Sequence, residues 1–440
     1  MRAAGASPRP RSPAPAEERV RARGRAAVLV AALLAARPAP AAEAGDDGPP
    51  LDLRLSLKAT ALVERQPDDP VLFPERDAAA GLWRLRLDGA ARPAGWALLA
   101  AAWETRLRVD SGAGAAGEGA AAGPLPREAA GPHRVWPLDW SLAAGSGLSW
   151  RHELDRAAVE LRDGPLRATL GRQAIGWGRG ALFGAYDLFA PFAPLEVDRE
   201  WRRGVDAARI ERRLGERGAA ELVVAGADRA ADMAVAGRLR GAAGDADAEL
   251  VAGWRAGDWL LGAGASGALR GAELHGELCA YRARDPLPAG GSLGDARLAL
   301  KAVAGASYDV PLGNGLLLLA EVHHSGFGAR RAADLGPLLA DPAFQRRLLR
   351  GDTQIPGRWA VAVTAGYEVS PLLAASLAVL ASLADGSGVA APQLRLSLSD
   401  RLSIVVSGEL PWGRAPAGAA LRSEYGATPI AGFAQIAVYE

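Results

Sequence analysis

One stretch of the chain holds most of the side chains that could act together on a charged solute. Residues 170–209 read LGRQAIGWGRGALFGAYDLFAPFAPLEVDREWRRGVDAAR, in which glycines and aromatic residues give way to interspersed basic and acidic residues. Rings of charged side chains select the ions that pass a narrow opening, so this composition fits selective contact with charged solutes. The candidate residues are Arg172, Gln173, Trp177, Arg179, Asp187, Asp198, Arg199, Glu200, Arg202, Arg203, Asp206 and Arg209.

The same stretch has a plainer interpretation, in which its charges only hold a loop in place. Its aromatic residues, such as Phe183 and Trp201, could pin the loop against a wall. Arg172 and Arg209 lie on the alternating segments that flank the loop, so they are the best candidates for anchoring ion pairs. Arginine outnumbers the acidic residues here, which favours anions as the solutes if the charges do contact them.

Signals typical of enzymes occur elsewhere but lack the context that they need. Residues 262–267 match G-x-G-x-x-G, yet a strictly alternating segment follows where a dinucleotide site requires a helix. Glu273, His275 and Glu277 share one strand face and could ligate a metal, although a charged lumen face has the same pattern. We therefore predict no cofactor, no metal site and no catalytic residue.

The elements around these residues alternate with a period of two. In residues 51–61, leucine and alanine occupy every odd position and polar residues every even one, as in a strand and unlike a helix. About eighteen such segments recur, each near the nine to eleven residues that a tilted membrane strand needs. Their polar faces carry too many charges for the dry core of a soluble sandwich. We predict an all-β fold, a transmembrane antiparallel β-barrel of about 18 strands, with 16 as the second choice.

The connections between the segments alternate in length, which places every long one at the same end of the sheet. The long ones cover roughly residues 65–80, 110–147, 174–203, 284–296, 325–357, 384–391 and 411–429. We expect residues 174–203 to fold inward as a constriction loop. Residues 325–357 should hold a short external helix, with Asp341 as its N-cap, Pro342 in its first turn and Gly351 at its end.

Tryptophans stand near the ends of several segments, where interfacial girdles of membrane barrels lie. They include Trp83, Trp96, Trp150, Trp254, Trp259 and Trp359. We expect them at the edges of the lipid-facing band.

The N-terminus resembles a secretory signal. Four arginines between residues 19 and 25 precede an apolar run at 26–36, and small residues suit cleavage near residue 44. Val20 could be the true start. Removing residues 1–44 takes away eight of 51 basic and three of 50 acidic residues, which leaves 43 and 47 and a net charge of −4. We therefore predict one barrel domain over residues 45–440 and no binding of nucleic acid.

The long charged stretch resembles Gram-negative outer-membrane β-barrel families of a porin-like or alginate-export-like type. The likeness rests on Gly171-Arg172-Gln173, Trp177-Gly178, Asp198-Arg199-Glu200 and the Gly204-Val205-Asp206-Ala207 run with Arg209. It covers about forty residues closely. It implies a barrel in the bacterial outer membrane, with the segment between the two strands turned inward.

The resulting hypothesis is an outer-membrane channel for the diffusion of small hydrophilic solutes, with anions favoured, and not an enzyme. A plugged, non-conducting structural or assembly barrel is the alternative, and an outer-membrane enzyme with a rim or lumen site is the second alternative. The expected partners are outer-membrane lipids, the barrel-assembly and periplasmic chaperone machinery and the solutes themselves. The sequence leaves the oligomeric state open.

Overall fold

The computed structural model describes residues 50–111, 133–145, 147–284 and 297–440, and nearly all of its regular structure is strand. The expected signal segment lies outside these residues. The strands are β1 (Leu51–Arg65), β2 (Asp77–Ala94), β3 (Ala97–Asp110), β4 (Asp139–Ala144), β5 (Leu148–Asp163), β6 (Leu166–Ala174), β7 (Gly204–Leu214), β8 (Gly218–Ala225), β9 (Ala234–Ala243), β10 (Ala246–Arg255), β11 (Asp258–Leu269), β12 (Ala272–Arg282), β13 (Leu298–Val310), β14 (Leu316–Ser325), β15 (Trp359–Ser370), β16 (Leu373–Ser382), β17 (Gly388–Ser399), β18 (Leu402–Trp412) and β19 (Ile430–Tyr439). The helices are α2 (Leu335–Ala340) and α3 (Pro342–Arg350), with short 3₁₀ turns η1 (Ala230–Asp232) and η2 (Ala332–Asp334).

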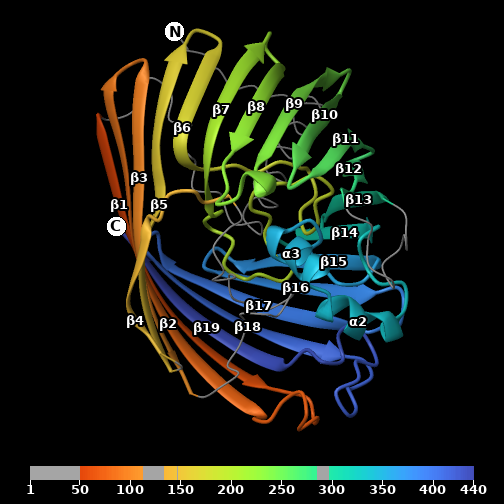
Figure 1. Cartoon of the computed structure of the whole chain (residues 1–440). Coiled ribbons are helices and arrows are strands. Elements are labelled where there is room, and N and C mark those ends of the chain that lie inside the picture. The colour runs from red at the N-terminus through yellow and green to blue at the C-terminus, as the bar shows by residue number, and fades with distance from the viewer. Residues whose placement is uncertain (1–49, 112–132, 146, 285–296) are drawn as a thin grey trace, which may run out of the picture.

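The strands form one closed antiparallel barrel (Figure 1). β1 pairs with β2 on one edge and with β19 on the other, which leaves the circumference without an open edge. Eighteen strands make this circumference, and the prediction of an 18-stranded barrel is confirmed. Among the described residues, no helix is long and apolar enough to cross a membrane.

β4 is an additional short strand that the sequence did not reveal. It pairs with residues 149–153 of β5, whose other edge is occupied there by β3. Further along, residues 157–163 of β5 pair with β6 instead. β4 therefore continues the wall on the side of β5 where β6 has already ended. Six residues between turn-rich segments carry little periodic signal, so alternation alone predicts a single connection over residues 110–147.

The two faces of the barrel differ in polarity, as the alternating sequence predicts. On β12, Leu278 points outward and is 54% exposed, whereas its neighbours Glu277 and Cys279 point inward and are buried. Exposed leucines recur on the outer face of neighbouring strands, for example Leu261 and Leu300. An apolar exterior around a polar interior is the arrangement of a transmembrane barrel.

Turn lengths distinguish the two rims of the barrel. One rim has tight connections, such as residues 95–96, 164–165 and 371–372, and the other has the long ones, including 66–76, 175–203, 326–358 and 413–429. The exposed tryptophans Trp83, Trp150, Trp259, Trp359 and Trp412 lie towards the long-connection rim, whereas Trp96 lies at the tight-turn rim. These positions are those of interfacial side chains.

Candidate pore constriction

Residues 175–203, here called the lumen loop, lie inside the barrel and extend from one wall to the opposite one (Figure 1). Near its start, Ala181 donates its backbone N–H to Glu321 of β14 over 2.5 Å. Near its end, Asp198 accepts hydrogen bonds from Lys58 of β1 and Arg84 of β2, at 2.7 and 2.8 Å. Because β14 lies far around the ring from β1 and β2, these contacts place the loop across the lumen.

The first half of the loop is held by three side chains that accept its backbone N–H groups. Seven consecutive residues, 179–185, all donate in this way. Glu277 of β12 accepts from residues 179, 180 and 185, and Glu321 accepts from residues 181, 182 and 183. Gln354 accepts the remaining one from Gly184 at 2.8 Å. Both glutamates are buried, so these hydrogen bonds supply partners to the buried carboxylates and to the loop amides at the same time.

The same half of the loop also contributes to an apolar core between itself and the wall. Tyr186 is fully buried and donates its hydroxyl to Glu249 of β10 over 2.6 Å. Its ring lies against β11, where a Cβ on Gly264 would come within 1.9 Å of its hydroxyl oxygen and one on Gly262 within 3.1 Å of its ring. Two glycines of the G-x-G-x-x-G pattern, Gly262 and Gly264, therefore make room for this tyrosine, which is a packing role.

Two further aromatic contacts attach the loop to the wall. Trp177 donates its indole N–H to Glu221 of β8 at 3.1 Å, and Arg209 of β7 pairs with the same carboxylate at 2.8 Å. Phe183 stacks on the buried His323 of β14 with the ring centroids 4.6 Å apart. With these contacts, the apolar half of the loop covers the wall from β8 to β14.

The second half of the loop is held by charges. Burial would raise the pKa of Asp198, but Lys58 and Arg84 outweigh this effect and hold the pKa well below its usual range. Glu200 contacts Lys58 at 2.5 Å and accepts the hydroxyl of Tyr439 at 2.8 Å. The loop thus bridges β1, β2 and β19, which are the strands at the closure of the barrel.

Trp201 brings an aromatic face to the same cations. Its ring lies 4.0 Å from the ammonium of Lys58, 5.1 Å from the guanidinium of Arg84 and 4.9 Å from that of Arg86. Contacts of this kind are worth about 0.5–2 kcal/mol each, depending on how far they are shielded from water. The indole therefore reinforces the attachment made by Asp198.

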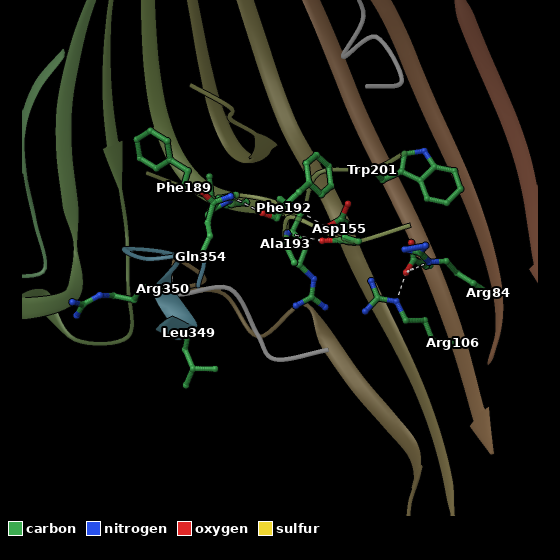
Figure 2. A pocket seen from close by; sticks show the side chains of 18 of the residues that line it. Arg84, Arg106, Asp155, Phe189, Phe192, Ala193, Trp201, Leu349, Arg350 and Gln354 are labelled. Atoms are coloured by element: carbon green, nitrogen blue, oxygen red, sulfur yellow. Dashed lines mark hydrogen bonds and ion pairs between the residues drawn. The ribbon is translucent and has the colours of Figure 1, made fainter. Parts of the chain in front are cut away.

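A charge-lined cavity remains between the lumen loop, the end of α3 and the wall from β2 to β5 (Figure 2). Phe189, Phe192 and Trp201 line it from the loop, and Gln354 lines it from the connection after α3. Its charged residues are five arginines and three acidic residues, namely Arg84, Arg86, Arg106, Arg203, Arg350, Glu104, Asp155 and Glu196. Basic residues therefore outnumber acidic residues in the lining of the cavity.

The connection 326–358 is a second inward element. The helix expected after Asp341 is confirmed as α3, whose first two free N–H groups bond to the Asp341 carboxylate and whose end is Gly351 in the left-handed conformation. The expectation that it is an external helix is wrong in one respect. It lies at the long-connection rim, but its Phe344 and Leu348 are buried, and a Cβ on Gly351 would strike Pro191 of the lumen loop.

Ion pairs hold this helix against the rim. Asp352 pairs with Arg255 of β10 and with Arg350, both at 2.7 Å, and Arg347 reaches Asp258 of β11 at 2.5 Å. α3 contains both apolar and basic residues, but only the folded barrel supplies the acidic partners and the loop that bury them. The local sequence therefore predicts the helix but not its inward orientation.

Arg172 and Asp206 lie in the wall, and their hydrogen bonds attach the wall to the segment before β4. The guanidinium forms two hydrogen bonds with the Asp206 carboxylate, at 2.7 and 2.9 Å, and donates to the carbonyl of Trp136. Asp206 accepts the backbone N–H groups of Val135 and Trp136. Gln173 points along the same wall and donates to the carbonyl of Ala207 at 3.0 Å. These three predicted site residues close the wall where β6 ends.

The other predicted residues make contacts within the loop or to the wall beneath it. Arg179 donates to Ser266 of β11 at 2.7 Å, and Arg202 pairs with Asp187 at 2.5 Å. Arg199 donates to loop carbonyls, including that of Ala193 at 2.8 Å. Of the twelve predicted residues, Arg203 alone appears among the residues that line the cavity.

The residues that face the loop from the wall are not among those predicted from the sequence. They are Lys58, Arg84, Arg86, Glu104, Arg106, Asp155, Glu249 and Glu321. Glu277 also faces the loop, although the sequence suggests it only as a possible metal ligand. Each occupies the polar face of an alternating segment, so its inward direction was readable. The height of each side chain along the barrel axis depends on strand register, and the alternation of polar and apolar residues does not specify this register. Within the described part of the chain, no group of three or more potential ligands is placed to hold a metal ion.

Comparison with known proteins identifies the fold. No protein-family model matches the chain, and no curated protein matches it in sequence. Among solved structures, OccAB1 of Acinetobacter baumannii has a TM-score of 0.54 at 8% identity, covering 89% of this chain and 96% of that one. A BenF-like porin from Pseudomonas fluorescens Pf-5 has a TM-score of 0.54 at 10% identity, covering 89% and 98%. OccK11 (OpdR) of Pseudomonas aeruginosa has a TM-score of 0.52 at 11% identity, covering 88% and 95%. The chain therefore has the barrel fold of these proteins along most of its length.

Proposed function

We propose that the protein is an outer-membrane channel through which small hydrophilic solutes diffuse, with a preference for anions. The observation that carries this proposal is the charge-lined cavity beside the lumen loop. A barrel of this strand number encloses an aqueous channel unless something fills it. Here the loop fills the side next to β8–β14 with an apolar core and leaves polar, charged residues facing β2–β5.

The preference for anions follows from the lining of that cavity. Arginines outnumber carboxylates there, and a positive opening lowers the free energy of an anion relative to a cation. Several of these arginines are already engaged by Glu104 and Asp155, so the selectivity should be modest.

The setting proposed for this channel is the bacterial outer membrane. The apolar outer face and the tryptophans towards its rims support contact with lipid. Insertion by the barrel-assembly and periplasmic chaperone machinery belongs to the same proposal, as does the absence of catalytic activity.

A plugged, non-conducting barrel is the second candidate, because the lumen loop reaches both walls and α3 packs against it. Single-channel recording of the refolded protein in a planar bilayer separates the two. A pore predicts reproducible ohmic steps and a reversal potential in a salt gradient that favours anions. Absence of steps from protein shown to be a folded barrel would overturn the channel and leave the structural role.

A further inference from the structure

Arginines gather at the long-connection rim where β12 ends and where β13 and β15 begin. Arg282 and Arg284 lie at and just beyond the end of β12, Arg297 precedes β13, and Arg358 precedes β15. The first three are exposed and Arg358 is half-buried. None of the four forms an ion pair with a residue that the structure describes. By contrast, arginines of the lumen such as Arg86 are paired with carboxylates.

Arg282 points away from the lumen, towards the apolar outer face of the barrel. Its chain neighbours Tyr281 and Ala283 are buried and face inward, so the alternation of side chains along the strand directs Arg282 outward. The cross-strand partners of Arg282 are Trp259 of β11 and Leu298 of β13, which are both strongly exposed. The guanidinium group therefore stands at the edge of the apolar band, beside a tryptophan of the interfacial kind.

Arg284 and Arg297 add two more positive charges at the same rim. Arg297 donates from its guanidinium group to the backbone carbonyl of Arg284 at 2.6 Å, which holds the two residues together. The side chain of Arg284 extends over the turn between β10 and β11, where a Cβ on Gly257 would lie 2.8 Å from its Cδ atom. Asp258 accepts the backbone N–H of Arg284 but already pairs with Arg347. This carboxylate therefore does not neutralise the two guanidinium groups.

Arg358 extends the positive surface to β14 and β15. Arg330 repels it, and the Nε atom of Arg358 is buried without a hydrogen-bond partner. Trp359, the next residue along the chain, is exposed and packs against His324 of β14 with the ring centroids 4.4 Å apart. Like charges held this close are stabilised by an anion that contacts both of them. The two groups of arginines, on β12–β13 and on β14–β15, thus present the same charge beside the same kind of aromatic residue.

A phosphate group is the anion that suits this surface. The guanidinium group of arginine is planar and always charged, and it binds phosphate oxygens through paired hydrogen bonds. Neighbouring tryptophans place these arginines at the depth where a membrane carries its polar headgroups. Clusters of basic residues at that depth attract lipids with anionic headgroups. Because Arg282 is on the outside of the wall, its ligand must come from the lipid and not from the solutes in the lumen.

We propose that this outward surface binds the phosphate groups of lipid headgroups in the membrane leaflet at the long-connection rim. This headgroup surface consists of four arginines and two tryptophans, namely Arg282, Arg284, Arg297, Arg358, Trp259 and Trp359. The arginines hold the phosphates, and the indoles contact the adjoining upper part of the acyl chains. The inference goes beyond the proposed channel, because it rests on the proposed membrane setting but not on conduction.

Binding of lipid A to the folded barrel in detergent micelles tests the proposal, with native mass spectrometry as the readout. Diphosphorylated lipid A should bind at least about tenfold more tightly than lipid A from which the phosphates have been removed. Arg282→Gln/Arg284→Gln should weaken binding of the phosphorylated form at least about fivefold and leave binding of the dephosphorylated form unchanged. Arg212→Gln is the matched control, because Arg212 is an exposed, outward arginine at the tight-turn rim of β7. It should behave like the wild type.

Equal affinity for the two forms of lipid A would overturn the proposal, as would a double variant that binds the phosphorylated form like the wild type. Inorganic phosphate at the same phosphate concentration should not displace the lipid, and displacement would mean that the surface binds free phosphate instead. Both substituted side chains are exposed, so the double variant should fold, and Arg358→Gln gives a second test of the same loss. A silent barrel that keeps the preference for phosphorylated lipid would overturn the channel and keep the headgroup surface. Normal conduction without that preference would do the reverse.

Discussion

At the scale of single residues, buried carboxylates perform most of the attachment inside this barrel. Glu221, Glu249, Glu277 and Glu321 face the lumen from alternate strands between β8 and β14, and each accepts a hydrogen bond from the lumen loop. Asp198 reverses the arrangement, because there the loop supplies the acid and the wall supplies the cations. The loop therefore has one end that depends on hydrogen bonds and another that depends on charge.

Gly264→Ala should displace the lumen loop, because the new methyl group would lie 1.9 Å from the hydroxyl oxygen of Tyr186. The strand ladder on both sides holds the β11 backbone, so the tyrosine must move and lose its bond to Glu249. Overpacking of this kind costs about 1–3 kcal/mol. Urea unfolding in lipid vesicles measures the loss. Gly276→Ala on β12, where the nearest atom is 3.7 Å away, should be close to neutral, and equal losses in both variants would contradict the packing argument.

Asp198→Asn should destabilise the protein at neutral pH by about 1–3 kcal/mol, because Lys58 and Arg84 lose the carboxylate that they share and keep only Glu200 and Glu104 as acidic partners. The pKa of Asp198 is lowered in the folded protein, so its contribution is fully present above the unfolded pKa of about 4 and is lost only at more acid pH. Unfolding free energies of wild type and variant should therefore converge only below that pH. Asp77→Asn, which removes an exposed partner of Arg65, is the control and should cause no measurable loss.

At the scale of elements, long connections from one rim occupy the lumen and fit against each other. The lumen loop contacts α3 through Pro191 and Gly351, and Gln354 donates to the carbonyl of Phe192 at 3.0 Å. The connection 413–429 joins this assembly where Glu424 accepts the backbone N–H of Gly357 at 2.8 Å. These loops should therefore respond together to changes in any one of them.

Deleting residues 178–194 should increase single-channel conductance, because it removes the part of the lumen loop that fills the space beside β8–β14. The strand ladder does not include these residues, so the barrel should still form. Recording the deleted and complete proteins under the same salt conditions makes the comparison. Unchanged conductance in a folded barrel would mean that the loop does not narrow the passage.

The stability contributed by the region around Glu424 should fall as the pH rises, because the buried carboxyl group becomes charged. Burial raises the pKa of Glu424 to about 7, with a smaller contribution from Asp385 and opposition from hydrogen bonds. A pKa raised above its unfolded value means that the stabilising contribution is complete in acid and is lost as the pH rises through about 7. The free energy of unfolding in lipid vesicles should fall over this range in the wild type. In Glu424→Gln the fall should be smaller, and a parallel fall in both proteins would exclude this carboxyl group as the cause.

At the scale of the whole molecule, the closed ladder of strands and the apolar outer face are suited to a protein that is surrounded by lipid. Closure of β1 on β19 leaves no unpaired edge along the circumference, and leucines cover the outer face. The interior is filled asymmetrically, with an apolar core on one side and charges on the other. This asymmetry sets where a solute could pass.

Leu278→Arg should cost about 2–4 kcal/mol of unfolding free energy in lipid vesicles, because Leu278 faces outward at the middle of β12. Leu269→Arg, at the end of β11 beside the tight-turn rim, should cost at most about 1 kcal/mol, since an arginine there reaches the interface. Equal costs at the two positions would be inconsistent with the proposed lipid boundary.

The sequence by itself determined the class of fold, the strand number and the two rims, since period-two alternation, strand length and connection length are local properties. It also marked the helix after Asp341 and the stretch between Leu170 and Arg209. Only the tertiary structure decided which wall residues meet that stretch, that α3 turns inward and that β4 completes the wall. Those outcomes depend on register and on tertiary contacts, some of them between residues more than a hundred positions apart, such as Lys58 with Asp198. Alternation fixes which way a side chain points but not the level at which it meets its partner.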